Sequence, residues 1–121
     1  MSSNSINNAL ASVAVRDLTL AEDWYRRLLG RAPDSRPMPE VSEWKFEGGG
    51  WLQVYQLPER AGSGSCTLSV DDIEQIAAHV QQMGIDTSNR SSNQKVKTLM
   101  ITDPDGNHIA FAEPIDLTMA H

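Results

Sequence analysis

The sequence predicts an α+β fold in which two βαβββ modules of one chain form a curved mixed β-sheet around a cavity, with the helices on the outer face. Two observations lead to this prediction. The pattern of alternating and helical apolar residues gives the order strand, helix and three strands, and this order occurs twice. The segment 66–73 also matches the segment 11–18 position by position, at an offset of about 55 residues. Because each half alone leaves one sheet face uncovered, two halves or two chains must pair to bury it.

The first module is expected to span residues 9–57, after a polar tail of residues 1–8. Its helix is predicted to begin with Thr19 as the N-cap and Glu22 completing a capping box, and to end at Gly30 in a left-handed conformation. The predicted elements are, in order, a strand at 9–15, a helix at 17–30, at most a short edge strand within the proline-containing segment 31–40, and strands at 43–47 and 51–56 joined by a hairpin at 48–50.

The second module is expected to span residues 65–114, after a polar linker at 58–64 and before a tail at 115–121, so that residues 1–121 make one domain. Its helix begins at Asp71 or Asp72 and ends at Gly84. A weak strand within 85–92 and strands at 95–102 and 108–113 complete it. The last two strands flank the segment 103–107 (Asp-Pro-Asp-Gly-Asn), which predicts a tight type I turn followed by a left-handed Gly106.

Charge and cysteine content exclude several classes of function. The net charge of −6 argues against a nucleic acid or an anionic membrane as partner, because both require a basic face. The single cysteine, Cys66, excludes an intramolecular disulfide and is expected to be a buried small side chain in a strand. No apolar run is long enough for a membrane helix, and residues 1–8 contain no signal-peptide core. We therefore expect a cytoplasmic protein.

Strand alternation divides the side chains into two sets. One set, in phase with Val13, Leu68 and Ile109, is expected to pack beneath the helices, and the other set faces away from them. The second set contains small hydroxyl and alanine side chains beside large aromatic ones, a mixture that suits a wet ligand pocket better than a packed core. Its members are Leu10, Ser12, Ala14, Trp51, Gln53, Tyr55, Ser65, Thr67, Ser69, His108, Ala110 and Ala112.

Three motifs carry a family resemblance: the run from Val15 to Gly30 (Val-Arg-Asp-Leu, then Trp-Tyr-Arg-Arg-Leu-Leu-Gly), the restart Ser-Val-Asp-Asp-Ile at 69–73, and the turn at 103–107. On these residues the sequence resembles the vicinal oxygen chelate superfamily, which includes glyoxalase I, bleomycin-resistance proteins, fosfomycin-resistance proteins and extradiol dioxygenases. The resemblance covers residues 9–114. It implies the duplicated fold, but not one activity, because the superfamily contains both metal enzymes and drug-binding proteins.

The resemblance also implies where a metal would bind. Metal-dependent members hold a divalent ion with His or Glu side chains of the cavity face, and the matching positions here are Leu10, Gln53, Ser65 and Ala110. Leucine and alanine have no donor atom, serine is a poor ligand and a neutral amide is a weak one. We therefore expect no metal and no other cofactor. His108 is expected on the cavity face near its rim, and His79 on the exposed side of the second helix.

The sequence thus predicts a metal-free small-molecule-binding protein of the glyoxalase/bleomycin-resistance type, whose ligand is aromatic or cationic. Two enzyme alternatives stay open: a lyase, isomerase or dioxygenase that works without metal, with His108 as general base, or one with non-standard metal ligands. A module that serves only as a dimer partner or regulatory domain is a further alternative. The resemblance also implies a homodimer, with the cavity near the subunit interface. The candidate ligand-binding residues are Leu10, Ser12, Trp44, Trp51, Gln53, Tyr55, Ser65, Thr67, His108 and Ala110.

Overall fold

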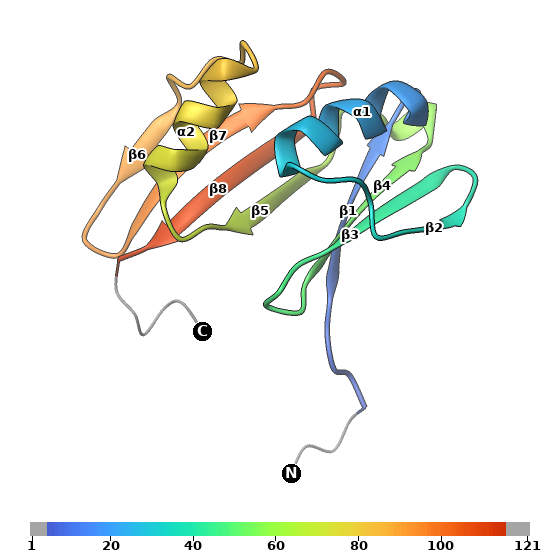
Figure 1. The fold of residues 1–121 in the computed structure, drawn as a ribbon, viewed down its shortest axis with the longest axis horizontal. Coiled ribbons are helices and arrows are strands. Elements are labelled where there is room, and N and C mark those ends of the chain that lie inside the picture. Colours follow the sequence, from blue (N-terminus) through green and yellow to red (C-terminus); the bar gives the residue numbers. More distant parts are fainter. Residues whose placement is uncertain (1–4, 116–121) are drawn as a thin grey trace.

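The computed structural model describes residues 5–115 and shows two four-stranded mixed sheets, each with one α-helix (Figure 1). The predicted α+β class and the repeated βαβββ order are confirmed. The first module contains β1 (Leu10–Val15), α1 (Leu18–Leu29), β2 (Ser35–Met38), β3 (Val41–Lys45) and β4 (Trp51–Gln56). A 3₁₀ turn (Pro58–Arg60) leads to β5 (Ser65–Ser69), α2 (Ile73–Gln82), β6 (Arg90–Ser92), β7 (Val96–Thr102) and β8 (His108–Pro114).

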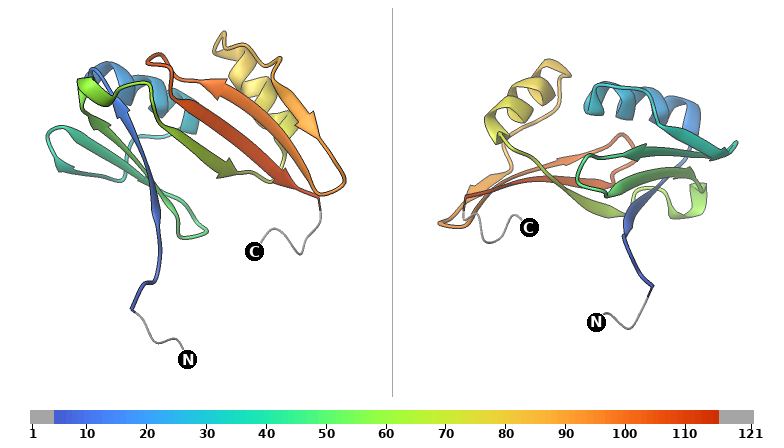
Figure 2. Two further views of the ribbon diagram at one scale, coloured as in Figure 1. Left: turned by 180° about the vertical axis from the view of Figure 1, so that it is seen from behind. Right: turned by 60° about the horizontal axis from the view of Figure 1, so that its bottom comes forward.

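The two sheets have the same topology. The strand order is β1-β4-β3-β2 in the first sheet and β5-β8-β7-β6 in the second. The first strand of each module pairs in parallel with the last, and the other pairs are antiparallel. Both α-helices cover the same side of the molecule (Figure 2), and the 3₁₀ turn Pro58–Arg60 contacts β1. No helix in residues 5–115 is long and apolar enough to cross a membrane.

The helix ends agree closely with the sequence, apart from the N-cap of α1 and the C-cap of α2. The N-cap of α1 is Asp17, whose side chain accepts a hydrogen bond from the backbone N–H of Leu20 (3.3 Å), so the prediction of Thr19 was wrong. Because this N-cap lies two residues before the predicted one, Glu22 does not form the predicted capping box. Glu22 instead accepts hydrogen bonds from Arg36 and from Ser42 of β3, and the Arg36 guanidinium lowers the pKa of this carboxyl.

Of the remaining caps, Gly30 was predicted correctly and Asp72 was one of two predicted starts of α2, whereas the C-cap of α2 is Met83, one residue before the predicted Gly84. Gly30 adopts φ +80° at the end of α1, where it needs no Cβ. Asp72 caps α2 by accepting from the N–H groups of Glu74 and Gln75.

Cys66 is 8 % exposed, and burial raises the pKa of its thiol to about 11, so the thiol stays protonated at neutral pH.

One continuous core lies between the helices and the two sheets. It joins both modules, because buried side chains of α1, α2 and all four central strands form a single cluster. Burying this apolar surface is the main favourable term in folding. Its fully buried members include Val13, Val15, Tyr25, Trp44, Leu52, Val54, Ile73, Val80, Leu99 and Ile109.

A buried polar network joins the two modules at the predicted turn. Asp103 accepts from the Tyr25 hydroxyl of α1 (2.7 Å) and from the Asn107 side chain (2.8 Å). Asn107 also donates to the Ala14 carbonyl of β1 (2.8 Å) and accepts from the Gly64 N–H (2.9 Å). Burial and the neighbouring Asp103 raise the pKa of Tyr25, which keeps its hydroxyl protonated as the donor.

The linker and the turn are in direct backbone contact. Gly62 has φ +88°, and a Cβ at this position would lie 2.3 Å from the Asp105 carbonyl oxygen. Only glycine allows this approach. The predicted left-handed conformation of Gly106 is confirmed, with φ +100°. The turn therefore contacts the linker before β5 in addition to α1 and β1.

Candidate functional site

The side of the two sheets that faces away from the helices forms one surface, which we call the open face. Strand alternation places the side chains as expected: Val13 and Leu52 are buried on the helix side, whereas Ser12 and Thr67 are exposed on the open face. Neither α-helix packs on this face (Figure 2). The face is not bare throughout, because Ala14 and Val41, which lie on it, are each only 4% exposed.

On the first sheet the open face consists of three cross-strand rows. The register of β1, β4, β3 and β2 brings residues of different strands side by side. The two outer rows carry aromatic and apolar side chains, with Lys45 at the end of one of them, and the middle row is entirely polar. The rows are Leu10–Trp51–Lys45, Ser12–Gln53–Glu43–Ser35 and Ala14–Tyr55–Val41–Met38.

The middle row is a continuous chain of hydrogen bonds, which we call the polar row. Ser12 Oγ donates to Gln53 Oε1 (3.2 Å), and Gln53 Nε2 donates to Glu43 Oε2 (2.8 Å). From the other edge, Ser35 Oγ donates to Glu43 Oε1 (3.1 Å). All these bonds lead toward Glu43, whose carboxylate is half-buried. A carboxylate accepts up to about four hydrogen bonds, so acceptor capacity remains for a ligand donor.

Glu43 was not predicted as a site residue, although the sequence holds a signal for it. The hairpin at 48–50 pairs Phe46 with Gly50, and counting outward from that pair places Glu43 opposite Gln53. Since Gln53 was already placed on the open face, its neighbour had to share that face. The observed strand β3 (Val41–Lys45) begins two residues before the predicted strand at 43–47, and the prediction did not assign its side chains to the two faces.

The ammonium group of Lys45 lies over the ring of Trp51, one of the two aromatic side chains of this face. The Lys45 ammonium is 5.8 Å from the centroid of the Trp51 ring, within the range of a cation–π interaction. Trp51, Gln53 and Tyr55 are half-buried, and Leu10 is 48 % exposed. The first sheet therefore presents one aromatic side chain on each side of the polar row, Trp51 on one side and Tyr55 on the other.

The second sheet presents small side chains on its open face. Ser65 lies opposite His108, and Thr67 lies opposite Ala110. His108 is exposed and forms no hydrogen bond with a carboxylate among the described residues. A histidine general base needs a partner that fixes its tautomer and orientation, and none is present in residues 5–115.

The prediction of Trp44 as a ligand-binding residue was wrong. Its side chain is completely buried on the helix side, 6.2 Å from the Tyr25 ring, and its Nε1 donates to the Arg31 carbonyl (2.9 Å). Because it adjoins Glu43 in β3, strand alternation places it on the other face. His79 is half-buried rather than exposed, and its Nε2 forms a hydrogen bond with the Arg27 carbonyl at the end of α1 (2.8 Å).

The four positions that match the metal site of related enzymes do not fit a metal. Leu10 and Gln53 belong to the first sheet and Ser65 and Ala110 to the second, and together they provide one amide and one hydroxyl as donors. Divalent transition metals require three or four imidazole, thiolate or carboxylate ligands. Elsewhere in residues 5–115, no three His, Cys, Asp or Glu side chains are grouped to hold an ion.

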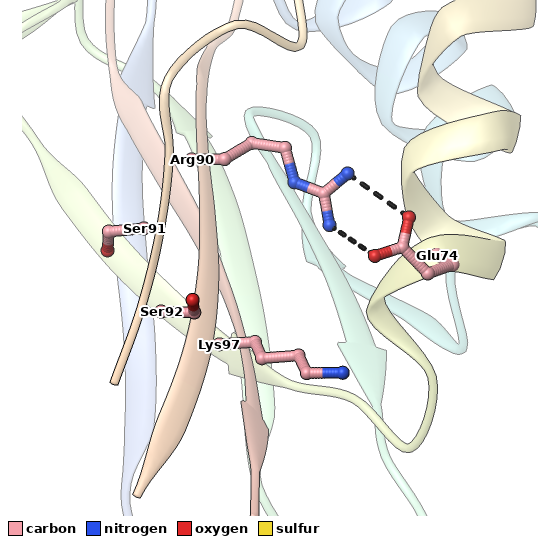
Figure 3. Close-up of a pocket in the computed structure, with 5 residues that line it drawn as sticks. All are labelled: Glu74, Arg90, Ser91, Ser92 and Lys97. Atoms are coloured by element: carbon pink, nitrogen blue, oxygen red, sulfur yellow. Dashed lines mark hydrogen bonds and ion pairs between the residues drawn. The ribbon is translucent and has the colours of Figure 1, made fainter. Parts of the chain in front are cut away.

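A shallow hollow of about 380 Å³ lies beside α2 on the second sheet, away from these residues (Figure 3). Its one arginine, Arg90, forms two hydrogen bonds with Glu74 (3.1 and 2.7 Å), so its charge is already paired. Lys97 and two serines complete the lining. No predicted site residue lines this hollow.

Comparisons with known proteins agree with this fold. The family model of the Glyoxalase/Bleomycin resistance protein/Dioxygenase superfamily matches residues 6–111. A glyoxalase/bleomycin resistance protein from Catenulispora acidiphila DSM 44928 is 34% identical, with a TM-score of 0.78, over 88% of this chain and 96% of that one. TnmS3, an antibiotic binding protein from Streptomyces sp. CB03234, is 25% identical, with a TM-score of 0.75, over 94% and 99%.

A more distant structure shares the fold alone. The bleomycin resistance determinant encoded on the transposon Tn5 is 18% identical, with a TM-score of 0.72, over 89% of this chain and 98% of that one. No protein of curated function matches the sequence.

Proposed function

The chain belongs to the Glyoxalase/Bleomycin resistance protein/Dioxygenase superfamily, and on that premise we propose that it is a metal-free, cytoplasmic protein that binds a flat aromatic molecule on the open face of its first sheet. Binding rather than catalysis is favoured because the four matched positions offer no metal ligand set, and because His108 lacks an orienting partner among the described residues. The antibiotic-binding activity named for TnmS3 supports this class of function.

The observation that carries the proposal is the polar row between two aromatic side chains. A flat ring that stacks on Trp51 or Tyr55 would bring its substituents over the middle row, where Glu43 and Gln53 offer an acceptor and a donor. Glu43 has no ion-pair partner among residues 5–115, since its carboxylate accepts from the amide of Gln53 and the hydroxyl of Ser35. A cationic or hydrogen-bond-donating group of the ligand would supply this carboxylate with a further partner.

Binding is testable with 2-naphthamidine, a flat cation, followed by calorimetry and by tryptophan fluorescence. Trp24 and Trp44 are buried, whereas Trp51 is half-buried, so quenching by a ligand of the open face should come mainly from Trp51. Trp51→Ala is expected to weaken binding about tenfold or more, because base-like stacking on an aromatic side chain contributes about 1–3 kcal/mol. Unchanged affinity in Trp51→Ala would place the ligand elsewhere.

We also propose that a second copy of the chain covers the open face. Apolar side chains are exposed at both ends of the first sheet, with Leu10 48% and Met38 52% exposed, and a two-fold axis would bury both copies of each patch. A dimer of twice 13.3 kDa is the expected species in analytical ultracentrifugation at micromolar concentration. A monomer that binds 2-naphthamidine with full affinity would contradict this arrangement.

A further inference from the structure

The position of Lys45 has a consequence for ligand selection. Its backbone is fixed from two sides, because its N–H donates to the Asp34 carboxylate (2.7 Å) and its carbonyl accepts from the Arg31 guanidinium. Its side chain is exposed, and its ammonium lies over Trp51 rather than in an ion pair with a described carboxylate. The backbone of Lys45 is therefore held in place, whereas its exposed ammonium group remains accessible to a ligand.

We propose that Lys45 is a specificity-determining residue which, together with Glu43, selects flat rings carrying an acceptor or anionic group at one end and a hydrogen-bond donor at the other. This inference rests on the proposed function and narrows its ligand class. Of the strand residues described on the open face, Lys45 is the only lysine or arginine, and Glu43 lies two residues away in the same strand. Two residues of a strand span about 7 Å, which is comparable with the long axis of a two-ring fused aromatic system.

The two charges act on different parts of such a ligand. Lys45 lies directly opposite Trp51, so an anionic substituent of a ring stacked there comes within reach of the ammonium. A ring with only a cationic group gains Glu43 but competes with Lys45 for the face of Trp51. A ring with only an anionic group gains Lys45 and faces the Glu43 carboxylate. Only the ring with both groups satisfies both residues.

Three probes of one shape separate these cases: 2-naphthoate, 2-naphthamidine and 6-amidino-2-naphthoate, titrated by calorimetry at low ionic strength. The last is expected to bind wild type most tightly. Lys45→Met should weaken 2-naphthoate about fivefold, because one exposed charged contact contributes about 1 kcal/mol. In the same variant the affinity for 2-naphthamidine should be unchanged or higher, since the Lys45 ammonium no longer competes for the face of Trp51. Glu43→Gln should show the reverse preference.

Two matched variants act as controls: Lys97→Met changes the same residue type on the helix side, and Glu59→Gln changes a glutamate of the 3₁₀ turn. Neither should change the ratio of the three affinities, and thermal melts check that every variant is folded. Lys45→Gln replaces Lys45→Met if the latter melts early. If 2-naphthamidine binds through Trp51 but Lys45→Met leaves the ratio unchanged, this inference is overturned and the proposed function stands. If no probe binds wild type, both are overturned.

Discussion

Asn107→Ala is expected to lower the free energy of unfolding by about 3–5 kcal/mol. The side chain is fully buried and makes three hydrogen bonds, to Ala14, Gly64 and Asp103. Truncation leaves a carbonyl, an N–H and a carboxylate each short of one partner, and the methyl group cannot replace them. Because Ala14 belongs to the first module and Asn107 to the second, the contact between modules weakens as well.

Urea unfolding measures this loss as a shift of the midpoint, with the slope checked for a change in cooperativity. Asn93→Ala is the matched control, since the Asn93 side chain also bonds the backbone, accepting from two N–H groups, but lies on an exposed turn, and it should cost about 1 kcal/mol or less. If Asn107→Ala does not fold, Tyr25→Phe tests the same network. It removes one of the four donors on Asp103 and should cost about 1–2 kcal/mol. Losses no greater than that of Asn93→Ala would show that the network does not stabilise the junction.

The sequence was sufficient for the features that depend on neighbours along the chain. The final hairpin and the left-handed Gly30 follow from a few residues each and are found where they were predicted, and the cap of α2 is Asp72, one of the two predicted starts. The cap of α1 shows the limit of such reasoning. Asp17 and Thr19 both suit an N-cap, and only the place where β1 ends decides between them.

The sequence was less informative about features that depend on how the modules meet. Strand alternation does not encode how the two modules sit relative to each other, so the sequence could not predict that both α-helices cover the same side (Figure 2). Glu43 and Trp44 show a second limit. A shift of one residue in phase exchanges the two faces, and the irregular segment before β3 hides where that strand begins.

Trp44→Ala is expected to cost about 3–5 kcal/mol of stability, the usual range for removing a fully buried aromatic side chain from a core. The ring contacts Tyr25, so a cavity at this position also loosens the α1 side chain that donates to Asp103. The Arg31 carbonyl would lose its donor in addition. Since Trp44 lies on the helix side, the variant that remains folded should bind 2-naphthamidine with unchanged affinity.

Trp51→Ala should show the opposite pair of effects, because Trp51 is half-buried on the open face and packs on Lys45 rather than on the core. Its stability loss should be about 1 kcal/mol, whereas its affinity for 2-naphthamidine should fall about tenfold. Measuring both quantities for both variants separates a tryptophan that supports the fold from one that contacts the ligand. Trp44→Phe, which keeps most of the volume and should cost about 1–2 kcal/mol, serves where Trp44→Ala unfolds. Equal loss of affinity in the two positions would mean that binding follows global stability and that the open face of the first sheet is not the ligand site.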